Sequence, residues 1–186
     1  MFAPVTAHPF PDVHALGEGP EPHPWLTPLL PYLGRWRGVG RGEYPTLDRP
    51  FHYEQEVTFG HDGRPFLHYE ARSWLVDPDS GAPLRPSGRE TGWWRVAPSG
   101  DMETVLAHPT GIVEASTGRV TAGADGPVVD LESFVTACTP VAKEVEGIRR
   151  HYALEAGELV FTQEMAAVGV AMSHHLSARL RRMPRG

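Results

Sequence analysis

Glycine stands at every second position of one short segment, and this pattern restricts the fold more than any other feature of the chain. The segment spans residues 34–46 and reads GRWRGVGRGEYPT. Glycine weakens a strand because it has no side chain to pack and costs conformational entropy. The period of two is that of a strand. It places on one face Gly34, Trp36, Gly38, Gly40 and Gly42. Such a strip lets another backbone or a flat ligand approach closely, or it belongs to a strand that bends at a tight barrel corner. Both interpretations predict a curved, closed β-sheet.

Short segments of alternating polar and apolar residues, separated by turns, follow this run. Residues 51–59 alternate in this way, and the turn His61–Pro65 leads to a partner strand over residues 66–75. Further strands are predicted over residues 91–96, 102–108, 111–116, 119–122, 128–135, 141–154 and 158–168, with a loop up to Gly88. The chain shows no long amphipathic helix. We therefore predict an all-β fold, an antiparallel up-and-down barrel of about ten strands.

The chain divides into a tail and one domain. Residues 1–24 are rich in Pro, Ala and Gly without periodicity, and we expect a disordered tail. Residues 25–33 are apolar but contain prolines, so we expect a helical turn or two that plugs one end of the barrel. The remaining domain is predicted to span residues 25–183, in line with a length of 186 residues.

Composition excludes several classes of function. The net charge of −6 disfavours nucleic acid as a partner. The single cysteine, Cys138, excludes an internal disulfide and a cysteine-based zinc site, and it fits a reducing cytoplasm. No apolar stretch approaches the roughly 20 residues that cross a bilayer. Because the first residues show no signal-peptide pattern, we expect a soluble cytoplasmic protein with no membrane partner.

Other candidate sites receive little support from the sequence. His61, His68 and His108 lack the spacing of a zinc site, although such a site stays open. Ser173 precedes His174, but no GxSxG elbow accompanies it. In the segment over residues 165–180, the residues up to Met172 are small and apolar, and His174 and His175 follow them. An imidazole after an apolar stretch suits a haem iron, whereas the alternative is a pair of exposed histidines at a strand end.

The ordered series of motifs resembles the nitrobindin family of haem-binding β-barrels. The pattern GxWxGxG followed by GxYPT begins the resemblance. It continues through EVTFG, GRPFL, ETG, LAHPTG, AKEV, MAAVG and HHLSARL, and covers roughly residues 25–182. The family implies a barrel distantly like lipocalins and fatty-acid-binding proteins, so we prefer a strand over a helix for residues 165–180.

The resemblance also implies a cofactor and its contacts. The expected cofactor is one ferric haem b per chain. The family's proximal iron ligand is the histidine directly before a Leu-x-Ala-x-Leu run, which is His175 here, and His174 should then face the opposite side. Thr46 is the position that the family places beside the haem, and Lys143 is expected to meet a propionate from an alternating strand. A turn hydroxyl and a plain surface lysine are the alternative interpretations of these two residues.

The function implied by the resemblance is that of an enzyme. Proteins of this family bind nitric oxide at a solvent-exposed iron and are assigned peroxynitrite isomerase activity, which yields nitrate. The first alternative is a lipocalin-like carrier of an apolar small molecule. The second is a haem-based sensor or store of nitric oxide. A homodimer is left open. The sequence offers no obvious distal acid or base, and Trp36 with its glycines is expected to shape the barrel rather than touch iron.

Overall fold

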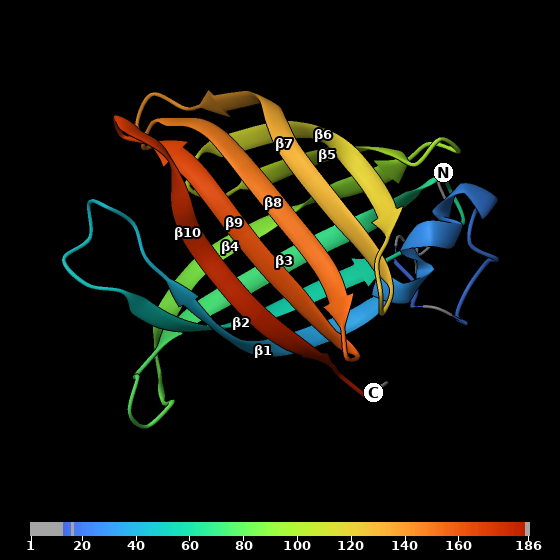
Figure 1. Cartoon of the computed structure of the whole chain (residues 1–186), viewed down its shortest axis with the longest axis horizontal. Helices are drawn as coiled ribbons and strands as arrows, with labels where there is room; N and C mark the ends of the chain where they lie inside the picture. The colour runs from blue at the N-terminus through green and yellow to red at the C-terminus, as the bar shows by residue number, and fades with distance from the viewer. Residues whose placement is uncertain (1–12, 16, 185–186) are drawn as a thin grey trace, which may run out of the picture.

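The computed structural model describes residues 13–15 and 17–184, and within these residues it forms a closed barrel of ten antiparallel strands around one lumen (Figure 1). A 3₁₀ helix, η1 (Pro24–Tyr32), precedes them. The strands are β1 (Gly34–Gly42), β2 (Phe51–Gly60), β3 (Phe66–Val76), β4 (Pro83–Val96), β5 (Asp101–His108), β6 (Ile112–Ala122), β7 (Pro127–Cys138), β8 (Val145–Glu155), β9 (Glu158–Ala167) and β10 (Val170–Arg182). Each strand pairs with its neighbours in sequence, and β1 pairs with β10 to close the sheet. The predicted all-β up-and-down barrel is confirmed.

The two ends of the barrel differ. Helix η1 lies against one end, beside the starts of β1 and β7 (Figure 1). Leu26, Leu29 and Tyr32 of η1 are buried there, so the predicted plug is confirmed. Because the strands run alternately up and down, the connections β1–β2, β3–β4, β5–β6, β7–β8 and β9–β10 all lie at the other end. That end, which we call the open end, has no such plug among the described residues.

The alternate glycines of β1 admit the groups that close the barrel. A side chain on Gly38 would meet the backbone of Arg179 and Leu180 in β10. On Gly40 it would meet the ring of Tyr53 and, at 2.5 Å, the carbonyl oxygen of Ser177. The Tyr53 hydroxyl donates to that same carbonyl across 3.1 Å. The close approach predicted from the glycine pattern is therefore made by β10 and by an aromatic ring of β2.

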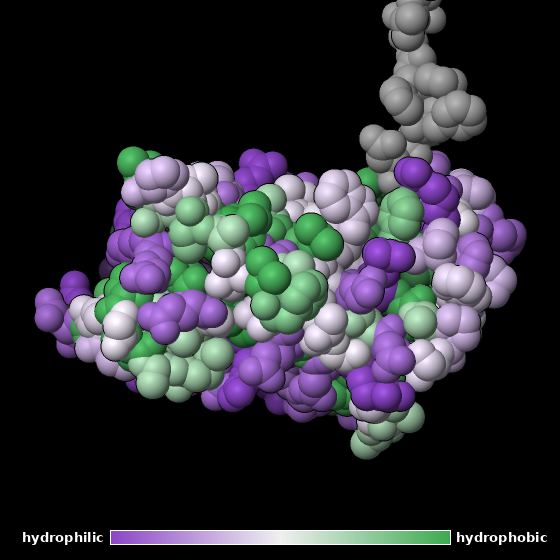
Figure 2. All heavy atoms as spheres, turned by 90° about the horizontal axis from the view of Figure 1, so that it is seen from above, coloured by the Kyte–Doolittle hydropathy of each residue, from purple (hydrophilic) through white to green (hydrophobic). Residues whose placement is uncertain are grey.

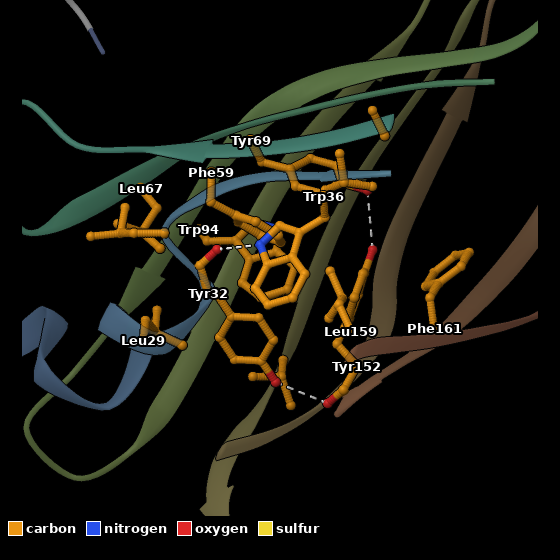
Figure 3. Close-up of a cluster of buried hydrophobic side chains, with 14 of the residues drawn as sticks. Leu29, Tyr32, Trp36, Phe59, Leu67, Tyr69, Trp94, Tyr152, Leu159 and Phe161 are labelled. Atoms are coloured by element: carbon orange, nitrogen blue, oxygen red, sulfur yellow. Dashed lines mark hydrogen bonds between the residues drawn. The ribbon is translucent and has the colours of Figure 1, made fainter. Parts of the chain in front are cut away.

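Aromatic rings fill the plugged half of the lumen (Figure 3). Trp36 is 1% exposed, and its indole nitrogen donates to the carbonyl oxygen of Tyr32 across 2.7 Å. The ring of Trp94 lies 4.9 Å from that of Phe59 and 4.8 Å from that of Tyr152, edge to face in both cases. Such pairs add to the free energy gained by burying the rings. Trp36 thus helps to form a packed core at the plugged end.

The outer surface mixes apolar and charged side chains (Figure 2). The large apolar side chains exposed on β4 to β7 include Trp93, Val105, Val113, Phe134 and Val135. Cross-strand ion pairs lie between neighbouring strands, and the most buried carboxylate among them is Glu56, which pairs with Arg35 at 3.1 Å and Arg72 at 2.6 Å. Burial alone would raise the pKa of Glu56, but the two guanidinium groups outweigh it and hold the pKa below its ordinary value.

Some boundaries differ from the sequence prediction. Residues 83–88, expected as a loop, belong to β4 and pair with β3 through two register shifts. Residues 112–122 form one strand, because Gly118 leaves room for the backbone of Asp130 on β7. Most of the expected tail lies outside the described residues. His14, however, exchanges two backbone hydrogen bonds with His61, at 2.7 and 3.0 Å, so this part of the segment is held against β2 rather than free.

The seam between β1 and β10 yields a first prediction. Replacing Gly40 with Val should lower the free energy of unfolding by about 1–3 kcal/mol, since the new side chain meets a fixed backbone carbonyl as well as a ring. The higher strand propensity of Val, worth at most about 1 kcal/mol, should not offset this clash. Urea unfolding measures the difference.

The matched control is Val39→Thr, on the same strand but 66% exposed on the outer face. It should change stability by no more than about 0.5 kcal/mol. Equal stability of the Gly40→Val variant and the wild type would show that the seam does not need its glycines.

Candidate functional site

A cavity opens inside the barrel toward the unplugged end, with about 880 Å³ of empty space, part of it open to solvent. Side chains from β2, β6, β8, β9 and β10 give it apolar walls. They are Phe51, Ile112, Val145, Ile148, Phe161, Met165 and Leu176. Glu90 of β4 and His108 of β5 add polar groups to the lining, and His175 lines the cavity from β10. The cavity therefore combines an apolar slot with a few polar groups, as ligand sites do.

A β-bulge in β10 decides which histidine enters the cavity. Leu176, Ala178 and Leu180 pair in regular register with β9 or β1, and strict alternation from them would turn His174 inward. The register shifts between His174 and Leu176, so that His175 is an extra residue. As a result His175 lines the cavity, while His174 is exposed and lines a groove on the outer face. The two histidines face opposite sides, as predicted. The segment 165–180 is extended rather than helical, as preferred, but a turn at residues 168–169 divides it between β9 and β10.

The surroundings of His175 fix its tautomer. Its Nδ1 lies 3.1 Å from the backbone carbonyl oxygen of Glu43, which can only accept a hydrogen bond. Nδ1 therefore carries the proton, and in the neutral ring Nε2 keeps a free lone pair. The rings of Tyr44 and Phe51 lie edge-on to the imidazole, at 5.3 and 6.4 Å between centroids. Burial lowers the pKa of His175 below its ordinary value, which favours the neutral form.

The structure places the other predicted site residues at the rim. Thr46 is exposed in the connection from β1 to β2, and Lys143 is exposed in the connection from β7 to β8. Lys143 was expected in an alternating strand, but β8 begins only at Val145, because residues 139–142 form a turn. Both connections lie at the open end, as His175 does. Neither Thr46 nor Lys143 is among the residues that line the cavity.

The glycine motif is separate from the cavity. Gly34, Trp36, Gly38 and Gly40 do not line it. Their contacts are with the plug, with β2 and with β10. The expectation that they shape the barrel agrees with this arrangement.

A buried charged network includes one residue of the cavity lining, Glu90. Arg150 of β8 is 3% exposed and donates to both carboxylate oxygens of Glu90, at 2.9 and 2.8 Å. Its Nε donates to Glu114 of β6 across 2.9 Å. The hydroxyl of Tyr69 donates to Glu90 across 2.6 Å and lies 3.3 Å from the hydroxyl of Tyr152. A single guanidinium thus joins β8 to β4 and β6 across the lumen, through hydrogen bonds strengthened by charge.

Burial and charge shift the pKa values of this network in opposite directions. Burial alone would raise the pKa of Glu90, but Arg150 outweighs it and holds the pKa below its ordinary value. Burial alone would lower the pKa of Arg150, but Glu114 and Glu90 raise it well above its ordinary value. Burial raises the pKa of Tyr152 to about 12. Glu90 and Arg150 are therefore charged, and the phenol of Tyr152 is neutral, at neutral pH.

The described residues contain neither a cluster of metal ligands nor a membrane-spanning helix. Within residues 13–15 and 17–184, no group of three or more His, Cys, Asp or Glu side chains is arranged to hold a metal ion. This disfavours a three-histidine zinc site. In the same part of the chain, no helix has both the length and the apolar character needed to cross a membrane.

Sequence reasoning missed the buried network. A signal was present, because Glu114, Arg150 and Gln163 stand at inward-facing positions of their strands, where apolar residues are the rule. Charged residues at such positions must find partners, since burying an unpaired charge is costly. Which strands face each other across the lumen is not visible in the sequence, so the partners could not be assigned.

The fold and the cavity define a class: a small antiparallel β-barrel whose open end holds a half-buried histidine beside an apolar slot. A sequence model described as "THAP4-like, heme-binding beta-barrel domain" matches residues 25–182. The chain therefore belongs to the THAP4-like haem-binding β-barrel family, and the predicted resemblance is confirmed.

Similar proteins cover nearly the whole chain. A protein of Streptomyces griseus named peroxynitrite isomerase is 55% identical over 183 residues, 98% of this chain and 96% of that protein. Peroxynitrite isomerase 2 of Mycobacterium marinum is 47% identical over 162 residues, 86% of this chain and 96% of that protein. The crystal structure of Rv2717c from M. tuberculosis superposes with a TM-score of 0.79 at 39% identity, and covers 88% of this chain and all of that one.

The buried network yields a second prediction. Replacing Arg150 with Met leaves Glu90 and Glu114 without their cation, and it should lower the free energy of unfolding by about 3–5 kcal/mol at pH 7. In the folded wild type the pKa of Glu90 is lower than in the unfolded chain. The contribution of Glu90 to the free energy of unfolding is therefore present above about pH 4.3 and is lost as the pH falls. The gap between wild type and variant should therefore narrow toward pH 4.

Arg149→Met is the control, because Arg149 pairs with Glu132 at 3.0 Å on the exposed outer face of the same strand. Loss of this exposed ion pair should lower the free energy of unfolding by about 0–1 kcal/mol. Urea unfolding of the three proteins at pH 7 and pH 4 gives the comparison. Similar losses from the two substitutions would mean that the buried network is not a main source of stability.

Proposed function

We propose that this protein holds one haem b at the open end of its barrel through His175, binds nitric oxide there and isomerises peroxynitrite to nitrate. The observation that carries the proposal is the fixed tautomer of His175. A histidine that ligates a metal commonly donates its other ring N–H to a carbonyl or carboxylate group. Glu43 supplies that carbonyl at 3.1 Å, which leaves Nε2 as the ligand atom on the cavity side.

The residues of the cavity fit a haem. Its porphyrin is flat and apolar apart from two propionates, so it suits a slot with apolar walls and an open rim. Phe51 and Leu176 flank His175, and Ile148 and Met165 lie in the wall formed by β8 and β9. The lowered pKa of His175 keeps the ligand neutral over a wider range of pH. We include in the proposal that Thr46 and Lys143, both exposed at the rim, contact the edge of the haem.

When bound, a haem supplies an iron with one open coordination position for a small anion or nitric oxide. Isomerisation of peroxynitrite breaks one O–O bond and forms one N–O bond, so it needs no other reactant. The chain's own part is to hold the histidine in one orientation and to keep the slot dry along its apolar walls. The open rim also lets a small anion enter and nitrate leave. Relatives named peroxynitrite isomerase, 41–55% identical, support this activity.

The third prediction separates the two neighbouring histidines. Haem-free protein should take up one equivalent of haem and show the Soret band of a ferric, histidine-ligated haem. His175→Ala should change that band and speed the transfer of haem to an acceptor protein. His174→Ala should leave both unchanged, because His174 is on the outer face.

Thermal unfolding of the haem-free variants is the control. Both should unfold near the wild-type temperature, since His175 is at the cavity wall and not in the aromatic core. If His174→Ala removes the haem signature and His175→Ala keeps it, the assignment of the ligand is wrong. A wild type that stays colourless on haem titration and binds long-chain fatty acids would instead support the apolar carrier.

The fourth prediction separates an enzyme from a sensor or store. Stopped-flow mixing of excess peroxynitrite with the haem-loaded protein should show decay faster than the spontaneous rate, over many equivalents, with nitrate as product. A sensor would bind nitric oxide but would leave the rate of peroxynitrite decay unchanged. The homodimer and the cytoplasmic location stay predictions.

A further inference from the structure

Strand order places His108 on the wall of the cavity that faces His175. The ten strands close in the order β1-β10-β9-β8-β7-β6-β5-β4-β3-β2, so β5 stands five strands from β10 in either direction. His175 belongs to β10 and His108 is the last residue of β5. Both line the same cavity. A flat ligand held by His175 therefore turns its other face toward the wall that carries His108.

The ring of His108 has no settled partner of its own. Its Nδ1 lies 3.5 Å from Glu90 and its Nε2 lies 3.9 Å from Glu114, both longer than the usual N–H···O distance of about 2.7–3.2 Å. Nε2 and the Oε2 atom of Glu114 are both buried, and neither makes a hydrogen bond within the described residues. The imidazole is 15% exposed. His108 therefore lines the cavity with hydrogen-bonding capacity that the surrounding side chains do not use.

Charged side chains from three strands surround the ring of His108. Glu90 of β4 and Glu114 of β6 face it, and Arg150 of β8 is the one guanidinium bound to both carboxylates. Other cations of the cavity wall are engaged elsewhere, because Arg72 pairs with Glu56 at 2.6 Å and Arg89 pairs with Glu70 at 2.9 Å.

We propose that His108 is a specificity-determining residue, which donates a hydrogen bond from the wall opposite His175 to an anion bound in the cavity. The proposal rests on the proposed function, because His175 must hold the haem for that anion to bind between them. The sequence alone offers no obvious acid or base for this side of the haem, and His108 is a candidate donor there. The contribution of His108 should be selective for anions, since a hydrogen bond to a charged acceptor is stronger than one to a neutral ligand.

The test compares an anionic and a neutral ligand on the haem-loaded ferric protein. Fluoride and imidazole are titrated into the wild type, His108→Leu and His108→Gln, with His174→Gln of the outer face as the matched control. Removing the donor should weaken fluoride binding on the order of tenfold in His108→Leu, the size expected for one charge-assisted hydrogen bond. His108→Gln keeps a neutral donor and should lose less. Imidazole affinity should stay within about twofold throughout.

Each outcome decides one claim. Fluoride affinity equal to wild type in both His108 variants would overturn the proposal while leaving the haem site intact. An equal loss of fluoride and imidazole affinity would also overturn it, because the effect would then be on the shape of the cavity. If His108→Leu does not fold or does not bind haem, the fluoride and imidazole affinities of His108→Gln decide alone. Failure of the wild type to bind haem would remove both this proposal and the proposed function.

Discussion

Pairing of β1 with β10 is the contact on which the rest of the molecule depends. It closes the sheet, and it works only because β1 carries glycine where β10 and the ring of Tyr53 come close. The same pairing brings His175 beside the end of β1, where the carbonyl of Glu43 accepts from its ring and the amide of Glu43 donates to the His175 carbonyl across 2.9 Å. Closure of the barrel and orientation of the candidate ligand thus come from one pair of strands.

The lumen is divided between two tasks. Toward the plugged end, aromatic rings pack around Trp36 and Trp94 and supply a rigid core. Toward the open end lies the cavity with its apolar walls, and Glu90 in its lining belongs to the buried network with Arg150 and Glu114. Close packing at one end allows the other to keep a cavity and buried charges, both of which cost stability. The network then restrains the wall that faces His175.

Much of the fold was predictable from the sequence because strands, turns and the alternate glycines leave local patterns. The alternation over residues 51–59 placed β2 correctly, and the apolar, proline-containing segment before Gly34 identified the plug. The errors have local causes. Residues 83–88 pair irregularly with β3, and their exposed side chains show no alternation. Residues 141–144, which include Lys143, were predicted as the start of a strand but belong to the turn and connection before β8.

The site was less predictable than the fold. Alternation from the leucines of β10 would have turned the wrong histidine inward, and only the bulge at His175 reverses it. The network of Glu90, Glu114 and Arg150 depends on which strands meet across the lumen, and so does the position of His108 opposite His175. These are properties of closure, which no local pattern records.

The central claim is that the Nε2 atom of His175 binds the iron, with His108 on the other side of the haem. A crystal structure of the haem-loaded protein tests it most directly. The account predicts an Fe–Nε2 bond to His175, with the Nδ1 atom still donating to the Glu43 carbonyl and the open coordination position turned toward β5. A haem bound through His108 or another residue, or lying outside this cavity, would contradict it.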